Sequence, residues 1–372
     1  MPINVLHVLD KLTVGEAHLH GVTRLCAWWI PAFDTSEFRV VAASLRGRDA
    51  AGEYLESCGV EMRYLGRSSF DPRAVPALID LARAEDIEVL HLHGYGATNF
   101  GRLCSARLGI PCIVHEHIVD EHMPAVQKLA DRLLSRAATR GIAISKATKD
   151  FMAGARAVPR ERIEVIYNGI PLDAYRDDAA SASEWKRGAG IPEHHRCVTI
   201  VGRLNEIKGH RYFLEAAATL AHGIDDVSFV VLGDGELMEP LKARAAELGI
   251  AERVFFLGHR DDVPDILRDS EISVVASLSE GGPLVLFEAM AARCATLITD
   301  TCGLAELIKE GENGFVIPPR DAAAIAARVE LLLEDSQLAK QVGECARQDA
   351  FSYDVESTVE KFQEIYRRLV AR

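Results

Sequence analysis

Short apolar runs alternate with longer stretches in which apolar residues recur every three or four positions. Apolar runs without strict alternation are typical of strands buried on both faces of a parallel sheet. Helical periodicity between the runs predicts helices such as 73–85, 97–108 and 123–138. The expected strands of this first series are 3–9, 38–43, 60–65, 88–92, 111–115, 141–144 and 163–166.

The same rhythm restarts after a polar break at 174–195. Two successive series of strands and helices predict two doubly wound α/β domains, which suits a chain of 372 residues. We expect domains at 1–170 and 171–353, with a final amphipathic helix in 354–372 that packs back on the first domain. The expected strands are 197–201, 227–232, 253–257, 271–276, 295–299 and 314–317, and the expected helices are 209–222, 237–248, 284–292 and 321–334.

Composition narrows the class of protein. With 48% hydrophobic and 26% charged residues, the chain fits a globular protein with two cores. No window of 18 uninterrupted apolar residues occurs, so we expect no membrane-spanning helix, and the N-terminus resembles a first strand more than a signal peptide. Eight single cysteines without a C-x-x-C pair favour reduced thiols and a cytoplasmic protein.

The net charge of -13 falls on the second half, because residues 1–170 carry equal numbers of basic and acidic side chains. An acidic second half is a poor general binder of nucleic acid, so no nucleic-acid partner is expected. Residues 126–162 are basic, and the spacing of Arg132, Arg136 and Arg140 predicts one helix face. That face is either simply solvated or a patch for peripheral contact with anionic lipid or an anionic acceptor, at the inner face of a membrane.

Chemistry in an open parallel sheet is expected at the carboxyl ends of the strands. Gly202, Arg203 and Lys208 follow the strand CVTIV directly. A guanidinium and an ammonium five residues apart can close on a diphosphate from two sides. The alternative is an ordinary loop with two surface charges.

A second segment follows the strand ISVVAS. Its two adjacent glycines allow close backbone approach to a ligand, and Pro283 suits the first helical position. The amides of Leu284 and Val285 would point at an anion, aided by the helix dipole. Glu288 follows Glu280 by about two helical turns, so two carboxylates could hold hydroxyls of an elongated ligand, unless Glu288 is a solvated helix residue. The candidate residues here are Glu280, Gly281, Gly282, Pro283, Leu284, Val285 and Glu288.

Two further strand ends are weaker candidates. Gly233 opens a Gly-Asp-Gly turn, which is either a binding feature or a bend between strand and helix. Leu257, Gly258 and His259 follow another strand, where backbone groups could hydrogen-bond a flat base, or where a plain loop could stand.

Taken in order, these motifs resemble the retaining glycosyltransferases of family 4, which have the GT-B fold of two Rossmann-like domains facing a central cleft. G-R-L-x-x-x-K-G, E-x7-E, G-D-G, F-L-G and Tyr167-Asn168-Gly169-Ile170 all occur here. The resemblance implies that Arg203 and Lys208 hold the donor diphosphate and that Glu280 contacts the transferred sugar. It further implies that the amides of 282–285 serve sugar and phosphate, that Glu288 contacts the ribose, and that 257–260 borders the base.

The first half carries the expected acceptor side. The family's Gly-Gly loop is represented by Gly15, with Glu16 in place of the second glycine, so Glu16 is expected to point away from the diphosphate or toward the acceptor. His-x-His occurs at His18/His20, His91/His93 and His115/His117. The resemblance implies that His115 or His117, with His115 preferred, faces the reacting sugar; His93 and Arg24 are weaker acceptor-side candidates, and His7 is expected in the core.

The resulting hypothesis is transfer of a sugar from a nucleotide diphosphate sugar to a lipid-linked, glycan or small-molecule hydroxyl, with retention at the anomeric carbon. No Asp-x-Asp pair sits at a strand end, so neither a metal nor another cofactor is expected. One alternative is a non-catalytic nucleotide-sugar or glycan-binding protein of the same fold. A zinc hydrolase built on the His-x-His pairs is another, and a nicotinamide dehydrogenase lacks its G-x-G-x-x-G motif after the first strand.

Overall fold

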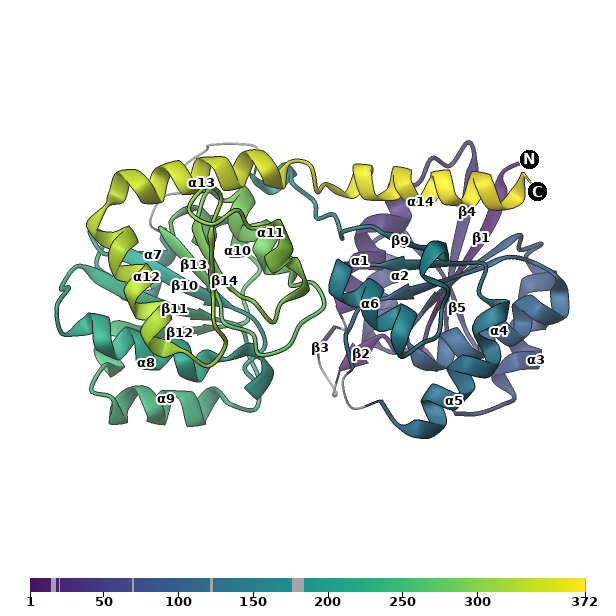
Figure 1. Cartoon of the computed structure of the whole chain (residues 1–372), viewed down its shortest axis with the longest axis horizontal. Coiled ribbons are helices and arrows are strands. Elements are labelled where there is room, and N and C mark those ends of the chain that lie inside the picture. The colour runs from purple at the N-terminus through teal and green to yellow at the C-terminus, as the bar shows by residue number, and fades with distance from the viewer. Residues whose placement is uncertain (15–17, 20, 69, 121–122, 176–183, 372) are drawn as a thin grey trace. The chain divides into compact units, whose positions relative to one another are not determined.

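The computed structural model describes residues 1–14, 18–19, 21–68, 70–120, 123–175 and 184–371. The chain forms two compact units (Figure 1): unit 1 is Met1–Ile170 with Asp354–Arg372, and unit 2 is Pro171–Tyr353. Each unit is built on a parallel β-sheet flanked by helices, which confirms the predicted fold class of two Rossmann-like domains.

The sheet of unit 1 has the strand order β5-β4-β1-β6-β7-β8-β9, and every neighbouring pair is parallel. Because all seven strands run the same way, their carboxyl ends meet at one edge. The strands are β1 (Ile3–Leu9), β4 (Phe38–Ser44), β5 (Glu61–Tyr64), β6 (Val89–His93), β7 (Cys112–Glu116), β8 (Arg140–Ala143) and β9 (Ile163–Val165), beside a small hairpin of β2 (Thr13–Val14) and β3 (His18–Leu19).

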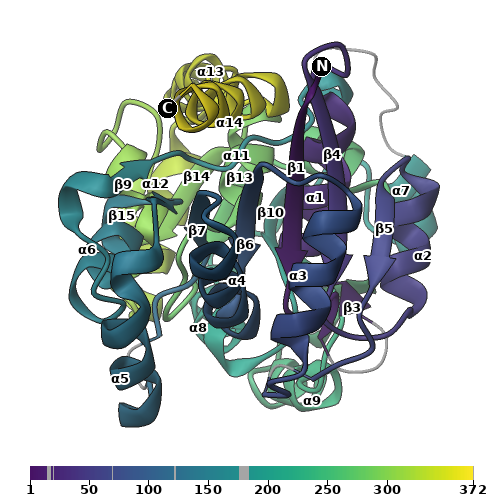
Figure 2. The same ribbon diagram turned by 90° about the vertical axis from the view of Figure 1, so that its right-hand side faces the viewer.

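Helices cover both faces of this sheet because alternate strand residues point to opposite sides. Leu6 and Val8 of β1 pack with α3 and α4, which Figure 2 shows in front of the strands, whereas Leu9 packs with α1 and α2. The helices are α1 (Gly21–Trp29), α2 (Ala50–Ser57), α3 (Ala74–Ala84), α4 (Tyr95–Leu108), α5 (Ala125–Leu134), α6 (Lys146–Gly154) and α14 (Val355–Val370).

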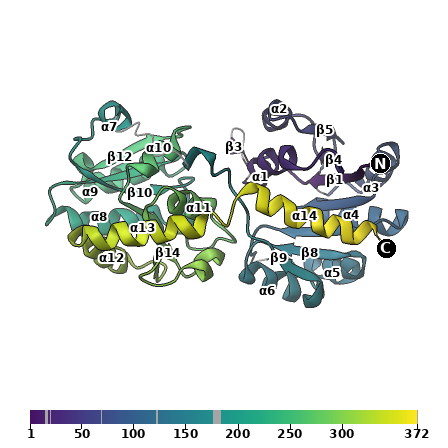
Figure 3. The same cartoon turned by 90° about the horizontal axis from the view of Figure 1, so that it is seen from above.

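The C-terminal helix α14 completes unit 1 and lies beside α1 (Figure 3). Phe362 meets Trp29 edge to face at 5.2 Å, and Arg367 pairs with Glu37 at 2.8 Å. Where the chain re-enters unit 1, a Cβ on Gly169 would lie 1.9 Å from the carbonyl oxygen of Asp354, so only glycine fits this crossing. The α14 segment therefore contributes side chains to the core of unit 1.

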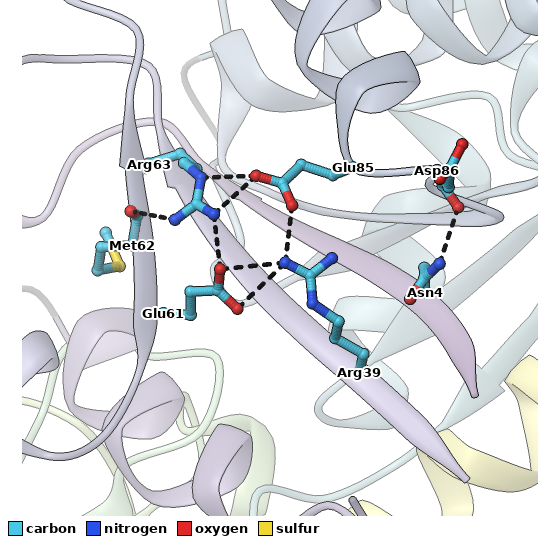
Figure 4. Close-up of polar contacts among 7 residues, drawn as sticks. All are labelled: Asn4, Arg39, Glu61, Met62, Arg63, Glu85 and Asp86. Carbon is cyan, nitrogen blue, oxygen red and sulfur yellow. Dashed lines mark hydrogen bonds and ion pairs between the residues drawn. The ribbon is translucent and has the colours of Figure 1, made fainter. Parts of the chain in front are cut away.

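The edge strand β5 is covered by an ionic cluster (Figure 4). Arg39 and Arg63 each contact both Glu61 and Glu85, at 2.6–3.0 Å between nitrogen and oxygen. Charged side chains on an edge strand discourage pairing with another chain, so we assign this cluster a structural role.

Unit 2 has the strand order β12-β11-β10-β13-β14-β15, again parallel throughout. Its main core joins Val198, Phe229 and Val274 of the sheet to α8 and α12. The strands are β10 (Arg196–Val201), β11 (Val227–Leu232), β12 (Val254–Gly258), β13 (Ile272–Val275), β14 (Ala295–Thr299) and β15 (Phe315–Ile317). The helices are α7 (Glu184–Ala189), α8 (His210–Ala221), α9 (Met238–Glu247), α10 (Val263–Arg268), α11 (Leu284–Ala291), α12 (Ala322–Glu334) and α13 (Ser336–Ala350).

One expectation about the chain's organisation is wrong. The helix expected over 123–138 ends at Leu134 and is followed by a short 3-10 turn, while Arg140 is the first residue of β8, so Arg132, Arg136 and Arg140 do not share a helix face. The polar break at 174–195 contains α7, whose Trp185 is buried among apolar residues. Among the described helices, none combines the length and the apolar character needed to cross a bilayer.

Candidate functional site

In unit 2, the predicted loops that follow β10, β11 and β12 are hydrogen-bonded to one another at the carboxyl edge of the sheet. The amide of Gly202 donates to the carbonyl of Leu232 at 2.9 Å, and that of Gly233 donates to the carbonyl of Gly258 at 2.8 Å. Gly233 has φ of +127°, and a Cβ there would lie 2.0 Å from the carbonyl oxygen of Gly202. Three strand ends thus form one closely packed backbone surface, which needs glycine at Gly233.

Lys208 and Glu280 are brought together on this surface, although 72 positions separate them in sequence. Lys208 Nζ lies 2.5 Å from Glu280 Oε2, which also accepts a hydrogen bond from Ser277 at 3.0 Å. The loop is held in place because Gly209, at φ +71°, packs so closely that a Cβ would lie 2.0 Å from the carbonyl oxygen of Ala276. The ammonium and carboxylate, each about one-fifth exposed, are therefore fixed at the ends of β10 and β13.

Arg203 differs from Lys208 in its surroundings. Its side chain is exposed, and within the described part of the chain no hydrogen bond or ion pair engages its guanidinium. Gly202, at φ +157°, packs near the methylenes of Lys208, so the two cations start from the same turn. A charged fork at the sheet edge without a partner is available to an anionic ligand.

Helix α11 supplies backbone donors to the same edge. It begins at Leu284, with Pro283 as the N-cap residue and not, as expected, the first helical residue, and no side chain caps its first turn. Gly281 is buried and Gly282 half-buried. The first amides of a helix lack partners within the helix, so those of Leu284 and Val285 are suited to bind an anion.

Glu288 is only 5% exposed, which excludes the alternative of a solvated helix residue. The segment at the end of β12 is more open: Gly258 has φ of +68°, Leu257 is half-buried, and the His259 side chain is 79% exposed. The structure thus places the Arg203, Lys208, Gly233, Gly258 and Glu280 segments at one edge of one sheet.

In unit 1, five histidines form a compact group that we call the histidine cluster: His7 of β1, His91 and His93 of β6, His115 of β7 and His117 just beyond it. Parallel register sets His7 opposite His91 and His93 opposite His115, and rings two residues apart on a strand stack. All but the half-buried His117 are at most 2% exposed. His7 belongs to the core as expected, but so do His91, His93 and His115.

Hydrogen bonds link the ring nitrogens of the cluster in two rows. His93 bonds through both nitrogens, to His7 at 3.1 Å and to His117 at 3.0 Å, so an acceptor could reach it only by displacing one of them. In the second row His91 Nε2 lies 3.0 Å from His115 Nδ1. The hydroxyl of Tyr366, on α14, joins the rows at 3.0 Å from His7 Nε2 and 2.6 Å from His91 Nδ1.

Burial keeps the imidazoles of the four buried members, His7, His91, His93 and His115, neutral. It lowers the pKa of His7 to about 3 and lowers the pKa values of His91, His93 and His115 well below the usual value, with neighbouring imidazoles adding to the effect on the last three. Burial also raises the pKa of Tyr366 well above that of a free phenol. The four buried imidazoles and the Tyr366 phenol are therefore uncharged, and their N–H and O–H groups are available for the hydrogen bonds between them.

A buried ion network that the sequence did not reveal includes Glu116, which lies between His115 and His117 along the chain. Asp131 on the inner face of α5 contacts Arg102 at 2.7 Å and Arg156 at 3.2 Å, and Arg156 contacts Glu116 at 3.0 Å. All four side chains are less than a tenth exposed, and burial raises the pKa of Glu116 and lowers that of Arg102. Arg156 is therefore not part of an exposed basic patch.

For the remaining acceptor-side candidates the structure gives few contacts. Arg24 is exposed and stacks over Trp28 at 4.6 Å. Gly15, Glu16 and His20 lie outside the described residues. Trp29 and Tyr366 were missed as site neighbours, because neither belongs to a motif; Trp29 stacks on His115 at 5.5 Å.

Two groups of three side chains within the described residues, His7–Cys26–His93 and His91–His93–His115, are close enough together to hold one metal ion. Imidazole and thiolate are ligands that suit zinc. Each contact between two ring nitrogens in the cluster is also explained as an N–H···N hydrogen bond, which needs no ion.

Comparisons with known proteins identify the family of the chain. Residues 21–174 match the family described as Glycosyltransferase Family 4, and residues 181–349 match the family described as Glycosyl transferases group 1. The chain therefore belongs to the family 4 glycosyltransferases. It is 27% identical over 306 residues to an Escherichia coli protein, UDP-Gal:alpha-D-GlcNAc-diphosphoundecaprenol alpha-1,3-galactosyltransferase, covering 80% of this chain and 79% of that one.

Other relatives and solved structures extend the comparison. The alpha-D-kanosaminyltransferase of Streptomyces kanamyceticus is 28% identical over 296 residues, which covers 75% of this chain and 76% of that protein. Anabaena HepE in complex with UDP superposes with a TM-score of 0.86, at 22% identity, over 99% of this chain and all of that one. These similarities establish a glycosyltransferase of the GT-B fold.

Proposed function

We propose that the protein is a retaining glycosyltransferase that moves a sugar from a nucleotide diphosphate sugar to a hydroxyl acceptor, in the synthesis of a cell-envelope glycolipid or polysaccharide. The observation that carries this proposal is the pairing of Lys208 with Glu280 where β10 and β13 end. Arg203 on the same loop and the first amides of α11 complete a set of anion-binding groups.

Breaking the bond between sugar and diphosphate places negative charge on the leaving group. Preorganised cations and helix amides stabilise such charge as it develops, so Arg203, Lys208 and the amides of Leu284 and Val285 can do so without a bound metal. Glu280 is held by Lys208 and Ser277 and serves as a hydrogen-bond acceptor for sugar hydroxyls. Glu288 is assigned to the ribose, and the Leu257–His259 segment to the base.

Retention follows from the family resemblance. No enzymic nucleophile is assigned, and we propose that the acceptor hydroxyl attacks on the face of the leaving group, whose phosphate oxygen takes the proton. The structures of HepE hold UDP and UDP-glucose, and the Escherichia coli relative is named for a UDP-sugar and a lipid diphosphate acceptor. These names support a UDP-sugar as the first donor and a lipid-linked acceptor as the first acceptor to test.

A panel of UDP-, GDP- and ADP-sugars, with chelator present, tests the proposed function. A donor that binds only the native state stabilises it by about 2.7 kcal/mol at a hundred times its Kd, so one base should raise the melting temperature clearly above the others. The same mixtures, supplied with lipid-linked or soluble acceptors, should release nucleotide diphosphate. Stabilisation without turnover would indicate a non-catalytic binding protein, and stabilisation by none would contradict the proposal.

We also propose that unit 1 contacts the membrane through α5, at the cytoplasmic face. Val126, Leu129 and Leu133 lie on one face of this helix and are 80%, 58% and 74% exposed. The exposed charges of α5 are Lys128 and Arg132, both basic, because Asp131 is turned inward. An apolar stripe flanked by cations is typical of a helix that lies in the interface of an anionic bilayer.

Replacing Val126 and Leu133 by serine should abolish most binding to vesicles of phosphatidylglycerol and phosphatidylcholine. Each buried aliphatic side chain contributes about 1.5–3 kcal/mol, so the double variant should lose about a hundredfold or more in affinity. Co-sedimentation measures this, with Leu331→Ser as the control, since Leu331 is an exposed leucine of a helix of unit 2. If the double variant and the control bound vesicles equally well, the proposal that α5 contacts the membrane would be contradicted.

A further inference from the structure

Among the described residues, five hydrogen bonds join the histidine cluster and Tyr366 into a series of six groups. In order these are His117, His93, His7, Tyr366, His91 and His115. Each neutral imidazole has one N–H and one bare nitrogen, and a phenol has one O–H. Six protons are thus available for five bonds, and one proton is left over.

This count leaves few arrangements. If every histidine carries its proton on Nε2, each bond has one proton, Tyr366 donates to His91, and the remaining proton is on Nε2 of His115. If every histidine carries its proton on Nδ1, Tyr366 donates to His7 and the remaining proton is on His117. The imidazoles of one row, His7–His93–His117 or His91–His115, must therefore share one tautomer. If two neighbours in a row had different tautomers, the hydrogen bond between them would contain two protons or none.

One mixed arrangement keeps all five bonds. In it both His7 and His91 donate to the oxygen of Tyr366, and the hydroxyl proton points out of the series. Tyr366 is fully buried, and no acceptor other than these two histidines is found for its hydroxyl among the described residues. A buried donor without an acceptor costs about 1–3 kcal/mol, which disfavours this arrangement.

We propose that the six groups are one proton-ordered series, in which Tyr366 is a positioning residue that makes all five histidines adopt the same tautomer. His115 and His117, at the two ends of the series, then always have the same tautomer. The residue that couples them, Tyr366, belongs to the C-terminal helix α14. A ligand that needs an acceptor nitrogen at His117 selects the Nε2–H arrangement of all five, and one that needs a donor there selects the Nδ1–H arrangement.

The relevance of this order to catalysis rests on the proposed function, which assigns His115 or His117 to the reacting sugar. Nε2 of His115 is buried and without a hydrogen-bond partner among the described residues. Moving from the Nδ1–H to the Nε2–H arrangement adds one proton at this atom and removes one from His117, while each bridging proton moves along its own bond. No imidazolium remains in the buried part of the series at either stage.

Ring packing favours this interpretation over a metal centre. The rings of His91 and His115 are inclined by only 25°, and those of His93 and His117 by 29°, so bonded pairs lie nearly edge to edge. His91 and His93, and His115 and His117, stack with centroids 4.6 and 4.1 Å apart. In each such pair one nitrogen of each ring is directed at the neighbouring ring in a hydrogen bond, whereas ligands of one ion would all point at a common centre.

Two-bond ¹⁵N–¹H correlation spectra of the histidine-labelled whole protein report the tautomer of each ring. In the wild type we expect all five histidines in the same tautomer. Tyr366→Phe removes the hydroxyl and keeps the ring, so the two rows become independent; His91 and His115 should then differ from His7 and His93, or show a mixture. Phe33→Leu, which alters the ring stacked on Tyr366 at 5.8 Å, should keep one tautomer throughout.

Mixed tautomers in the wild type, or one tautomer retained in Tyr366→Phe, would overturn the proposal. So would elemental analysis that finds one zinc, copper or other transition-metal ion bound per chain and removable together with a shift of these resonances. The spectra need no substrate. Inactivity with every nucleotide sugar would therefore reject the proposed function while leaving the tautomer result as it stands.

Discussion

Replacing Lys208 by alanine is expected to lower the rate of sugar transfer by a factor of about 10²–10³. The ammonium lies 2.5 Å from Glu280 and is fixed by a loop that packs against β13. Its removal takes away a positive charge that is already positioned where the leaving diphosphate is proposed to develop charge. Removal also leaves the carboxylate of Glu280 without its cation, so the site becomes more negative.

The measurement is nucleotide release at saturating donor, together with the melting temperature of the variant. Lys242→Ala is the matched control, because Lys242 is a half-exposed lysine of unit 2 whose partner, Glu239, is 80% exposed. We expect Lys242→Ala to retain the wild-type rate. A Lys208→Ala enzyme that is folded and works at the wild-type rate would contradict the role assigned to Lys208.

Replacing Asp131 by asparagine is expected to destabilise unit 1 by about 3–5 kcal/mol. The side chain is fully buried and neutralises Arg102, which has no other ionic partner among the described residues, and it also contacts Arg156. Asparagine has nearly the same shape but no charge. Among the described residues, Glu116 would then be the one carboxylate in contact with the two guanidinium groups.

Urea unfolding followed by tryptophan fluorescence measures this effect, since Trp28 and Trp29 both belong to unit 1. The control is Asp150→Asn, because Asp150 also pairs with an arginine, Arg160, but both side chains are more than 60% exposed. An exposed pair contributes about 0–1 kcal/mol, so the control should shift the transition little. Equal shifts for the two variants would show that the buried network adds no stability.

Strand positions could be predicted from the sequence because buried parallel strands are nearly continuous apolar runs. Each predicted strand agrees with an observed one within about two residues, from β1 at Ile3–Leu9 to β15 at Phe315–Ile317. Helices were harder to predict. The continuous helix expected over 123–138 ends at Leu134 and is followed by a 3-10 turn, and α7 forms inside the segment described as a polar break. Local composition does not show where tertiary packing, such as that of Trp185, stabilises a helix.

The candidate site could likewise be predicted from the sequence only in part. Glycine-rich strand ends indicated which segments of unit 2 to combine, but the contact between Lys208 and Glu280 depends on the order of strands β10 and β13. The i, i+2 spacing predicted that each histidine pair shares a face. It could not reveal the cross-strand register that bonds His93 to both His7 and His117, nor the arrival of Tyr366 from the other end of the chain.

The charge pattern was the least reliable guide. Nine basic residues in 126–162 suggested a single basic face. In the structure Arg156 is buried in an ion network and Arg160 pairs with Asp150. The exposed cations that remain are spread over several elements: Lys128 and Arg132 lie on α5, Arg136 lies in the 3-10 turn after it, and Lys146 lies on α6. A count of charges cannot distinguish a solvated arginine from one that neutralises a buried carboxylate.

A crystal structure of the protein with the nucleoside diphosphate that stabilises it most tests the central claim directly. We predict the two phosphates within hydrogen-bond distance of the Arg203 or Lys208 side chain and of the amides of Leu284 and Val285. A diphosphate bound to other groups, with both cations extended into water, would contradict it.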